Sequence, residues 1–538
     1  MLLPKPSVLF VLFLLGCNAH DRKFPAGFKF GSASSAYQVE GAWNVSDKGE
    51  SVWDRYSHEH PDTFVNGNGD VAIDSYYLWK EDVKTAHELG LQFYRFSISW
   101  TRILPSGFPT AISETGKKYY SNLIDGLLEK GIEPIVTLYH WDLPQKLQDL
   151  GGWTNPLISD WFADYARVVF SLYADRVKTW ITINEPILIC DGAYNMQFTA
   201  PAIKEMELAP FLCNKHTLIA HAKAWRIYDT DYRPKYHGKI SLVNNLVWMK
   251  PAAPEYKDLA ELAVQHCVGR YAHPIFSKQG GWPPNIARVM AEYSKKQGHV
   301  RSRLPEFTKN EIHLIKGTYD FFGMNMYTSR LVRPSRPGDG PRIWFHSGSP
   351  ELNITLVADP RWKFGAMILM PSYPEGLRQQ IAWLRKEYGE NLPIIITENG
   401  YASHKRDLDD EDRIEYLIDH LKQVLLSIWE DGANITGYSV WSLTDNFEWM
   451  AGYSIRFGLY DVDFEDPKRT RTVRASAHFY KNLIKSRKLH TDNLKQWSSQ
   501  ITYQQKTQSR NSAPGFIHIW WQMLIIQLIL RQSGLWIK

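Results

Sequence analysis

The sequence has 538 residues, and its 62 Lys and Arg against 57 Asp and Glu give a formal net charge of +5. These charges form no block of one sign, so the sequence gives little support for nucleic-acid binding. The chain is long enough to bury a large core, either as one domain or as several.

The first residues of the chain have the pattern of a secretory signal peptide. In "MLLPKPSVLFVLFLLGCNA" a single lysine precedes an apolar run that ends at small residues. The run is too short to cross a membrane. We therefore predict that residues 1–19 are a signal peptide cleaved near Ala19, and that the protein is secreted or enters the lumen of the secretory pathway.

A protein in that compartment can carry disulfides and glycans. Three cysteines remain after cleavage, namely Cys190, Cys213 and Cys267. Three cysteines cannot all pair within one chain, so the fold is not built on disulfides, and the sequence leaves their pairing open. Asn-X-Ser/Thr motifs predict N-glycosylation at Asn44, Asn353 and Asn434.

Eight short runs of β-forming residues recur along the chain, and a longer helical pattern follows each run. The predicted strands are residues 28–38, 93–100, 133–141, 179–186, 239–246, 319–329, 393–400 and 435–443. The segments between them are amphipathic: in "EDRIEYLIDHLKQVLLSIWEDG" the residues Ile414, Leu417 and Leu421 fall on one helical face. Helices ending in glycine are expected at Gly90, Gly131 and Gly432.

Strand and helix in eightfold alternation, without repeats or a clear linker, predict a parallel sheet. A single closed (β/α)8 TIM barrel with long loops after the strands fits this length and alternation. An open doubly wound sheet is the alternative, but no Gly-rich phosphate-binding turn follows the first strand. We predict that the barrel domain spans residues 20–493.

Residues 494–538 are predicted to be a tail of uncertain order. The tail contains "FIHIWWQMLIIQLIL", residues 516–530, which is strongly apolar but interrupted by polar residues. A membrane span needs about 20 residues. A lipid-anchor signal would end in an apolar tail, whereas this chain closes with "RQSGLWIK". Membrane association through this segment is therefore the less favoured interpretation.

Polar and aromatic residues stand where the predicted strands end. They are Gln38, Arg95, His140, Trp141, Asn184, Glu185, Asn325, Tyr327, Glu398, Trp441 and, just after the last strand, Glu448. A lone glutamate in such a place is more often a helix cap or a solvated loop residue. Here every strand except the fifth is followed by a hydrogen-bonding or aromatic group, and in a (β/α)8 barrel these ends meet at the active site.

Two of these residues, Glu185 and Glu398, are carboxylic acids that could act together. A pair of carboxyl groups facing a sugar is the usual means of cleaving a glycosidic bond, with one protonated and the other ionised. A separation of about 5 to 5.5 Å gives retention and a wider one inversion; at the mouth of one narrow barrel we expect the short separation. No HExxH motif, Cys/His spacing or G-x-S-x-G motif is present, so we expect no metal, no cofactor and no serine nucleophile.

The motifs "TINEP" and "ITENG", with "YRFSISW", "HWDLPQ" and "NFEW", resemble the signature set of glycoside hydrolase family 1, the retaining β-glycosidases. The resemblance runs from Phe24 to Leu489, and its motifs are highly specific in combination. It implies a TIM barrel that hydrolyses terminal β-D-glucosyl residues from small-molecule O-glucosides by double displacement, in the style of secreted animal β-glucosidases and myrosinases.

The resemblance also implies a role for each residue. Glu185 resembles the acid/base and Glu398 the nucleophile, while Arg95 and Tyr327 resemble the residues that orient the nucleophile. The residues expected to bind the sugar are Gln38, His140, Trp141, Asn184, Asn325, Trp441, Glu448 and Trp449. The residue chemistry agrees, because a cationic arginine favours an ionised Glu398 and a neighbouring carboxylate should raise the pKa of Glu185.

Two other functions fit some of the same residues. Family members that resemble receptors lack one glutamate of the pair, so the presence of both disfavours a sugar-binding module without catalysis. A thioglucosidase of the myrosinase kind is the other alternative. Plant enzymes of that kind resemble one another in having glutamine at the acid/base position, so Glu185 favours O-glycosides, although the animal enzymes resemble this chain in keeping the glutamate.

The leaving group is not identified by the sequence. Loops around residues 191–204, 330–341 and 345–363 are expected to contact it, but they show no pattern typical of one leaving group. A digestive or a defensive role and the oligomeric state are likewise left open.

Overall fold

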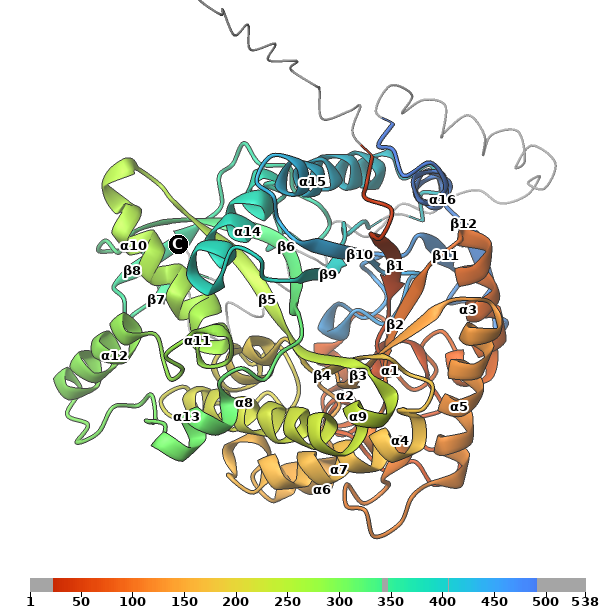
Figure 1. The fold of residues 1–538 in the computed structure, drawn as a ribbon, viewed down its shortest axis with the longest axis horizontal. Coiled ribbons are helices and arrows are strands. Elements are labelled where there is room, and N and C mark those ends of the chain that lie inside the picture. The colour runs from red at the N-terminus through yellow and green to blue at the C-terminus, as the bar shows by residue number, and fades with distance from the viewer. Residues whose placement is uncertain (1–22, 341–346, 405, 491–538) are drawn as a thin grey trace, which may run out of the picture.

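A computed structural model describes residues 23–340, 347–404 and 406–490. In this part of the chain helices surround a closed barrel of eight parallel strands (Figure 1). The predicted (β/α)8 fold is therefore confirmed. The predicted signal peptide and the predicted tail, with its apolar segment 516–530, lie outside the described residues. Within them, no helix is both long and apolar enough to cross a membrane.

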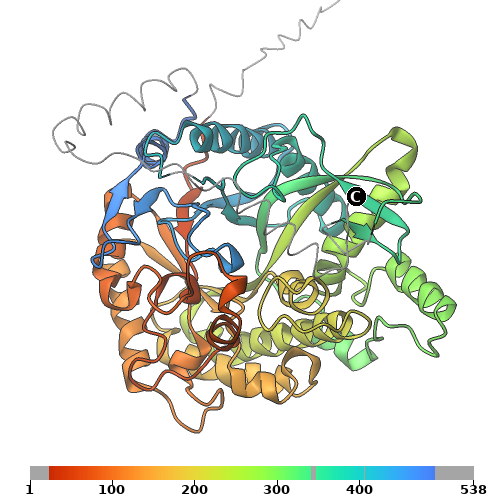
Figure 2. The same cartoon turned by 180° about the vertical axis from the view of Figure 1, so that it is seen from behind.

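The strands of the barrel follow one another around it in chain order. They are β1 (Lys29–Ala33), β2 (Phe93–Ser97), β3 (Glu133–Tyr139), β4 (Thr179–Asn184), β5 (Lys239–Pro251), β6 (Phe322–Pro334), β9 (Ile394–Asn399) and β10 (Ile435–Trp441). Each pairs in parallel with its neighbours, and β1 pairs with both β2 and β10, which closes the barrel. The first and last parts of the chain therefore lie side by side (Figure 2).

Each predicted strand coincides with one barrel strand, but the boundaries differ, most of all for the first, fifth and sixth strands. The first strand ends at Ala33, and Ala36–Val39 forms the short helix α1, because the backbone N–H of Ala36 donates to Ser97 Oγ (2.7 Å) instead of to a neighbouring strand. The strands β5 and β6 are longer than expected, since they continue to pair with each other beyond the barrel. There β6 also pairs antiparallel with β8 (Ile354–Val357), which pairs with β7 (Gly348–Ser349).

Long helices cover the outside of the barrel. They are α3 (Ser75–Leu89), α5 (Glu114–Glu129), α7 (Ile158–Tyr173), α8 (Ala209–Ile227), α14 (Glu375–Tyr388), α15 (Glu411–Trp429) and α16 (Ala475–Ser486). As predicted, Gly90, Gly131 and Gly432 follow helices and have left-handed backbone conformations. Such conformations carry no Cβ penalty in glycine.

Shorter elements fill the connections. They are α2 (Val52–Glu59), α4 (Trp100–Ile103), α6 (Gln145–Asp149), α9 (Arg233–Tyr236), α10 (Lys257–Val264), α11 (Arg270–Phe276), α12 (Pro284–Lys296) and α13 (Lys309–Ile315), with a β-hairpin of β11 (Tyr460–Val462) and β12 (Arg471–Val473). The turns of 3-10 type are η2 (Pro61–Thr63), η3 (Gly152–Thr154), η6 (Pro254–Tyr256) and η8 (Trp449–Ala451), and those of π type are η4 (Leu188–Met196), η5 (Tyr228–Tyr232) and η7 (Gln265–Gly269).

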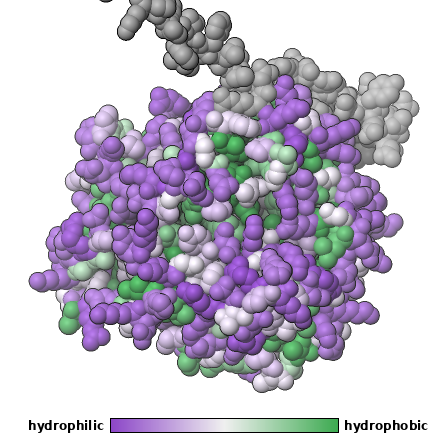
Figure 3. Space-filling model, viewed as in Figure 1, coloured by the Kyte–Doolittle hydropathy of each residue, from purple (hydrophilic) through white to green (hydrophobic). Residues whose placement is uncertain are grey.

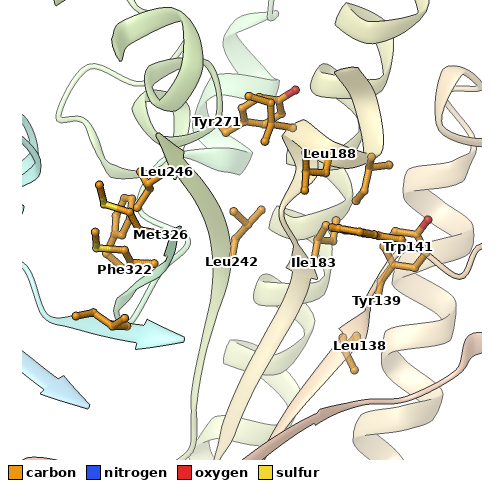
Figure 4. Packing of buried hydrophobic residues seen from close by; sticks show 14 of the residues in the cluster. Leu138, Tyr139, Trp141, Ile183, Leu188, Leu242, Leu246, Tyr271, Phe322 and Met326 are labelled. Carbon is orange, nitrogen blue, oxygen red and sulfur yellow. The ribbon is translucent and has the colours of Figure 1, made fainter. Parts of the chain in front are cut away.

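The main hydrophobic core lies between the barrel and the helices. Figure 4 shows part of it, with Ile183 on β4, Leu242 and Leu246 on β5, and Met326 on β6. Successive residues of a strand point to opposite faces, so Val243 and Asn245, which alternate with the core-facing residues of β5, point into the barrel. The face of the molecule in Figure 3 is mostly hydrophilic, with small separate apolar areas.

A second, small apolar cluster belongs to the barrel strands and to the start of β6. It consists of Phe93, Ile135, Ile181, Val243 and Phe321. Two residues further along, the same faces of β2, β3 and β5 carry Arg95, Thr137 and Asn245. The inside of the barrel is therefore apolar towards the amino ends of the strands and polar towards their carboxyl ends, where the active site was predicted.

The side chains of the predicted glycosylation sites Asn44, Asn353 and Asn434 are exposed. A glycan could be attached to each without disturbing the core, so glycosylation stays a prediction that the fold permits.

A buried ion network anchors the segment after β10. Asp445 accepts hydrogen bonds from Arg474 Nη1 (2.9 Å) and Nη2 (2.8 Å) and from Arg456 Nη1 (2.8 Å). Burial by itself would raise the pKa of Asp445, but these two arginines outweigh it and lower the pKa to about 2. The network fixes the stretch of chain that carries Trp441 and Glu448.

Replacing Asp445 with Asn should lower the free energy of unfolding by about 3 kcal/mol, because Asp461 would then be the one carboxylate left to neutralise the buried pair Arg474 and Arg456 among the described residues. The native stabilisation is present above the unfolded-state pKa of about 3.9 and is lost as pH falls towards the folded-state value. Urea unfolding at pH 7 measures the loss. Glu81→Gln, which breaks the exposed pair with Lys84, is the matched control and should cost less than about 1 kcal/mol. Equal losses in both variants would contradict the anchoring role.

Candidate active site

The polar end of the barrel gathers the residues that were predicted from the strand ends. Eight described side chains there are linked by hydrogen bonds: Arg95, Thr137, Asn184, Glu185, Asn245, Asn325, Thr397 and Glu398. They lie on β2, β3, β4, β5, β6 and β9, with Glu185 directly after β4. Residues far apart in the sequence thus meet because parallel strands bring their carboxyl ends to one edge.

Glu398 on β9 is held by two donors. Arg95 Nη1 donates to Glu398 Oε1, and Tyr327 Oη donates to Oε2 (2.7 Å). The side chain of Arg95 is fully buried and that of Glu398 is nearly so. A guanidinium and a phenol that both donate stabilise the ionised carboxylate, which is the form that a nucleophile needs.

Arg95 is itself fixed by neighbours on both sides. Its Nε donates to Thr137 Oγ1 (3.1 Å) and its Nη2 donates to Asn184 Oδ1 (2.6 Å). Asn184 reaches the inside of the barrel because the pairing of β4 with β5 shifts register between Ile181 and Asn184. Such an irregularity turns a side chain to the other face of the sheet.

Glu185 follows β4 and is also buried. Its backbone has a left-handed conformation (φ 48°), and its N–H donates to the carbonyl of Val243 on β5 (2.9 Å). Its Oε1 accepts from Asn245 Nδ2 (2.9 Å) and from Asn325 Nδ2 (2.8 Å). Left-handed conformations of non-glycine residues gather at functional sites, where the surrounding structure enforces them.

The pKa of Glu185 is raised to about 8. Burial is the main cause and the charge of Glu398 the next, while the two amide donors and Arg95 oppose the shift. Glu185 is therefore protonated at neutral pH, which is the state of a general acid.

The predicted sugar-binding residues surround this pair. Gln38 on α1 donates to Asn446 Oδ1 (3.0 Å) and to the carbonyl of Phe447 (2.9 Å), and it lies 3.5 Å from Glu448 Oε2. The pKa of Glu448 is raised to about 8, first by burial and then by the charge of Glu398. This carboxyl group is thus poised to donate or to accept a hydrogen bond.

Aromatic rings form one side of the site. The ring centroids of His140 and Trp441 are 5.8 Å apart, and those of Trp141 and Trp449 are 4.6 Å apart. Burial and then Arg95 lower the pKa of His140 well below its usual range, so its ring is neutral. Asn184 Nδ2 lies 3.1 Å from His140 Nε2, while His140 Nδ1 is buried and has no hydrogen-bond partner in the described part of the chain.

The structure brings all twelve predicted catalytic and sugar-binding residues to this end of the barrel, although Gln38 lies on a helix and Trp449 in the turn η8. Sequence analysis missed Asn245, which contacts Glu185 directly. The fifth strand had no polar residue at its predicted end. The signal that could have found Asn245 is the alternation within the strand, which puts Val243 and Asn245 on the same inward face.

The segment after Glu185 is tied to the helix layer. A disulfide joins Cys190 in η4 to Cys213 in α8, and Cys267 is a buried free thiol. Beside the disulfide, Asp191 accepts a hydrogen bond from Arg270 Nη2 (2.9 Å). The sequence left the pairing of the cysteines open, and in the structure Cys190 and Cys213 are the pair. Among the described residues, no group of three His, Cys, Asp or Glu side chains could hold a metal ion.

The sequence matches the profile of glycosyl hydrolase family 1 over residues 20–489. It is 46% identical over 473 residues to Myrosinase 1 of Brevicoryne brassicae, covering 87% of this chain and 100% of that protein. It is 41% identical over 469 residues to a human cytosolic β-glucosidase, covering 86% of this chain and 98% of that protein.

Solved structures show the same relationship. The fold is similar to that of an aphid myrosinase, with a TM-score of 0.82 and 45% identity over 86% of this chain and 99% of that chain. It is also similar to a rice β-glucosidase solved in a covalent complex with glucose, with a TM-score of 0.78 and 34% identity over 86% and 98% of the two chains. The chain therefore belongs to glycosyl hydrolase family 1 and is a glycosidase.

Replacing Glu185 with Gln should lower kcat/KM for β-glycosides with poor leaving groups by about 100- to 10,000-fold, because only these need a proton from the enzyme. Activated aryl glycosides should lose much less. Since Glu185 must be protonated, wild-type activity should fall as pH rises through about 8, and Glu185→Gln should lack this decline.

The pH dependence of kcat/KM for both kinds of substrate measures this. Glu448→Gln is the control, because Glu448 titrates in the same range and its replacement should leave the Glu185 decline in place. A uniform loss for all leaving groups would contradict the acid/base assignment.

Proposed function

We propose that this family member is a retaining β-glucosidase that hydrolyses terminal, non-reducing β-D-glucosyl residues from O-glucosides. The proposal rests on two carboxyl groups, Glu185 and Glu398, whose surroundings favour opposite protonation states. Arg95 and Tyr327 donate hydrogen bonds to Glu398, which favour a carboxylate there, whereas burial and the charge of Glu398 raise the pKa of Glu185 to about 8. One nucleophile and one acid are the two groups that double displacement requires.

In the first step Glu398 attacks the anomeric carbon and the bond to the leaving oxygen breaks. Glu185 donates its proton to that oxygen, so the leaving group departs neutral and the sugar is held as an ester on Glu398. The negative charge of Glu398 disappears with ester formation. The second-largest cause of the raised Glu185 pKa disappears with it.

In the second step Glu185, now more easily ionised, accepts a proton from water as the water oxygen attacks the anomeric carbon. The bond to Glu398 breaks, and the carboxylate returns to its hydrogen bonds with Arg95 and Tyr327. Two inversions give overall retention.

The preference for glucose rests on the residues around Glu448. Gln38 and Glu448 lie together, and the resemblance to the family assigns them to the hydroxyl groups at C4 and C6 of the terminal sugar. In its ionised form Glu448 would repel a phosphate at C6. Hydrogen bonds from sugar hydroxyls to the ionised form of Glu448 would be worth about 1.5–3 kcal/mol each. The neutral form, which predominates below the raised pKa of about 8, can still donate to or accept from a hydroxyl. We therefore propose an unphosphorylated β-D-glucoside as the preferred substrate.

A partly exposed apolar segment near the site favours a substrate whose leaving group has apolar surface. In residues 364–370, Met367 and Met370 pack against a small apolar cluster that includes Tyr327 and Trp441. In the same segment Phe364, Ile368 and Leu369 are 40%, 58% and 49% exposed. Exposed apolar side chains next to a polar site are typical of ligand contacts. This segment directly follows the loop 345–363 expected from the sequence.

A thioglucosidase of the myrosinase kind is the second candidate. The similarity to Myrosinase 1 along the full length of that protein favours it. The presence of Glu185 is compatible with both functions, but a proton donor is more important for an oxygen leaving group than for a thiol-derived one. A sugar-binding protein without catalysis is the least favoured, because both carboxyl groups and their hydrogen-bonding partners are in place.

A 2-deoxy-2-fluoro-β-D-glucoside with an activated leaving group should inactivate the enzyme and add one sugar to Glu398. Fluorine at C2 slows both steps, and the good leaving group lets the first one proceed. Mass spectrometry of the labelled peptide identifies the residue. Glu398→Gln should not be labelled. A sugar on another residue, or an α-anomer as the first product of an ordinary substrate, would contradict the retaining mechanism.

The sugar preference should appear as kcat/KM in the order β-glucoside, then β-fucoside and β-galactoside, with no hydrolysis of a 6-phospho-β-glucoside. Glu448→Ala should lower the values for glucoside and galactoside about tenfold or more relative to fucoside, because fucose has no hydroxyl group at C6.

The same panel includes a glucosinolate and an aryl thioglucoside, so that faster hydrolysis of these would favour the second candidate. If Glu448→Ala lowers all three values for the aryl O-glycosides equally, Glu448 braces the loop and the sugar is recognised elsewhere.

A further inference from the structure

We propose that Asn245 is a positioning residue for the acid/base, which directs the proton of Glu185 to Oε2 and favours the ionised form that the second step needs. The proposal rests on the retaining mechanism above and adds a residue to it. Asn245 lies on the inward face of β5 and is 8% exposed. Its Nδ2 donates to Glu185 Oε1 at 2.9 Å.

Both amide donors use the same oxygen of Glu185. Asn245 Nδ2 and Asn325 Nδ2 donate to Oε1 at 2.9 and 2.8 Å. An oxygen that accepts two N–H groups has little capacity left to carry a proton. The proton of the acid form is therefore on Oε2, and the two amides make a carboxylate at Glu185 easier to form.

The two asparagines differ in their other contacts. Asn325 also donates to Asn184 Oδ1 (3.1 Å), and its Oδ1 accepts from Thr397 Oγ1 (2.6 Å). It is therefore part of the hydrogen-bonded frame of the barrel. Asn245 Oδ1 is buried without a partner, and its contact with Glu185 is the one side-chain hydrogen bond that it makes among the described residues.

Because of this difference, we infer that Asn245 acts on Glu185 and does not stabilise the fold. A buried carbonyl oxygen without a donor lowers stability, and leucine of similar shape would not have that defect. Leucine at position 245 would therefore favour stability. The asparagine is explained instead by its hydrogen bond to the acid/base Glu185.

The effect of Asn245 on the pKa of Glu185 can be measured separately from the effect of the neighbouring charges. The titratable and charged groups around Glu185 are Arg95 on β2, Tyr327 on β6, Glu398 on β9 and Glu448 after β10. Replacing Asn245 with Leu removes one neutral donor and leaves all four in place. A change in the titration of Glu185 would then report the lost hydrogen bond.

The test compares Asn245→Leu with Asn244→Leu. Asn244 immediately precedes Asn245 in the same strand, is also buried, and points to the opposite face, away from Glu185. Asn245→Leu should move the alkaline decline of kcat/KM to higher pH by about one unit, since a hydrogen bond to a charged group corresponds to roughly one to two pKa units. Asn244→Leu should not move it.

A second readout follows the second step. With 2,4-dinitrophenyl β-D-glucoside, hydrolysis of the ester on Glu398 limits kcat, and Glu185 must then be ionised. Asn245→Leu should shift the acidic limb of kcat upward by about one pH unit, so that kcat at pH values below this limb falls about tenfold. Its thermal unfolding temperature should equal or exceed that of the wild type.

The possible results distinguish a role of Asn245 in the chemistry from a structural role. Unchanged pH limbs with lower activity, or a lower unfolding temperature with equal losses for both variants, would show that Asn245 is structural and would overturn the proposal. Failure of the wild type to hydrolyse any β-glucoside would contradict the proposed function instead, so the two failures are distinguishable.

Discussion

A single buried cation determines the charge of the whole site. The guanidinium of Arg95 has no exposed surface, and a buried charge is tolerated only where a counter-charge and hydrogen bonds surround it. Glu398 supplies the counter-charge, while Thr137 and Asn184 accept the remaining hydrogen bonds. Removing any partner would leave part of Arg95 uncompensated, so the ionised state of Glu398 is a condition of the folded barrel as well as of the chemistry.

The state of the second carboxyl group follows from the first. Glu185 is buried near a charge that Arg95 and Tyr327 keep in place, so its own charge is disfavoured. The two carboxyl groups therefore differ because one of them, Glu398, pairs with the arginine. In the proposed mechanism this difference is reversed when Glu398 becomes an ester. The two amides on Glu185 Oε1 oppose the raised pKa and prevent it from becoming too high for the later role as a base.

Most of the fold was predictable because its signals are local. Apolar runs, amphipathic segments and glycines at helix ends depend on neighbours in sequence, and the carboxyl ends of parallel strands must share an edge. Other features depend on tertiary contacts. Asn184 faces the site because the pairing of β4 with β5 shifts register. Gln38 lies on a helix in which the backbone N–H of Ala36 donates to Ser97 Oγ. Cys190 pairs with Cys213 because η4 packs on α8. No sequence pattern distinguishes these outcomes from their alternatives.

The site itself contains features that lower stability. Asn245 Oδ1 and His140 Nδ1 are buried and have no hydrogen-bond partner among the described residues, and Glu185, Trp141 and Trp449 have left-handed backbones. The compensating contacts lie outside the barrel, in the Asp445–Arg474 network after β10 and in the disulfide after β4. Because these anchors hold the segments that carry Glu185, Trp441 and Glu448, the barrel can keep polar groups free for a sugar without losing their geometry.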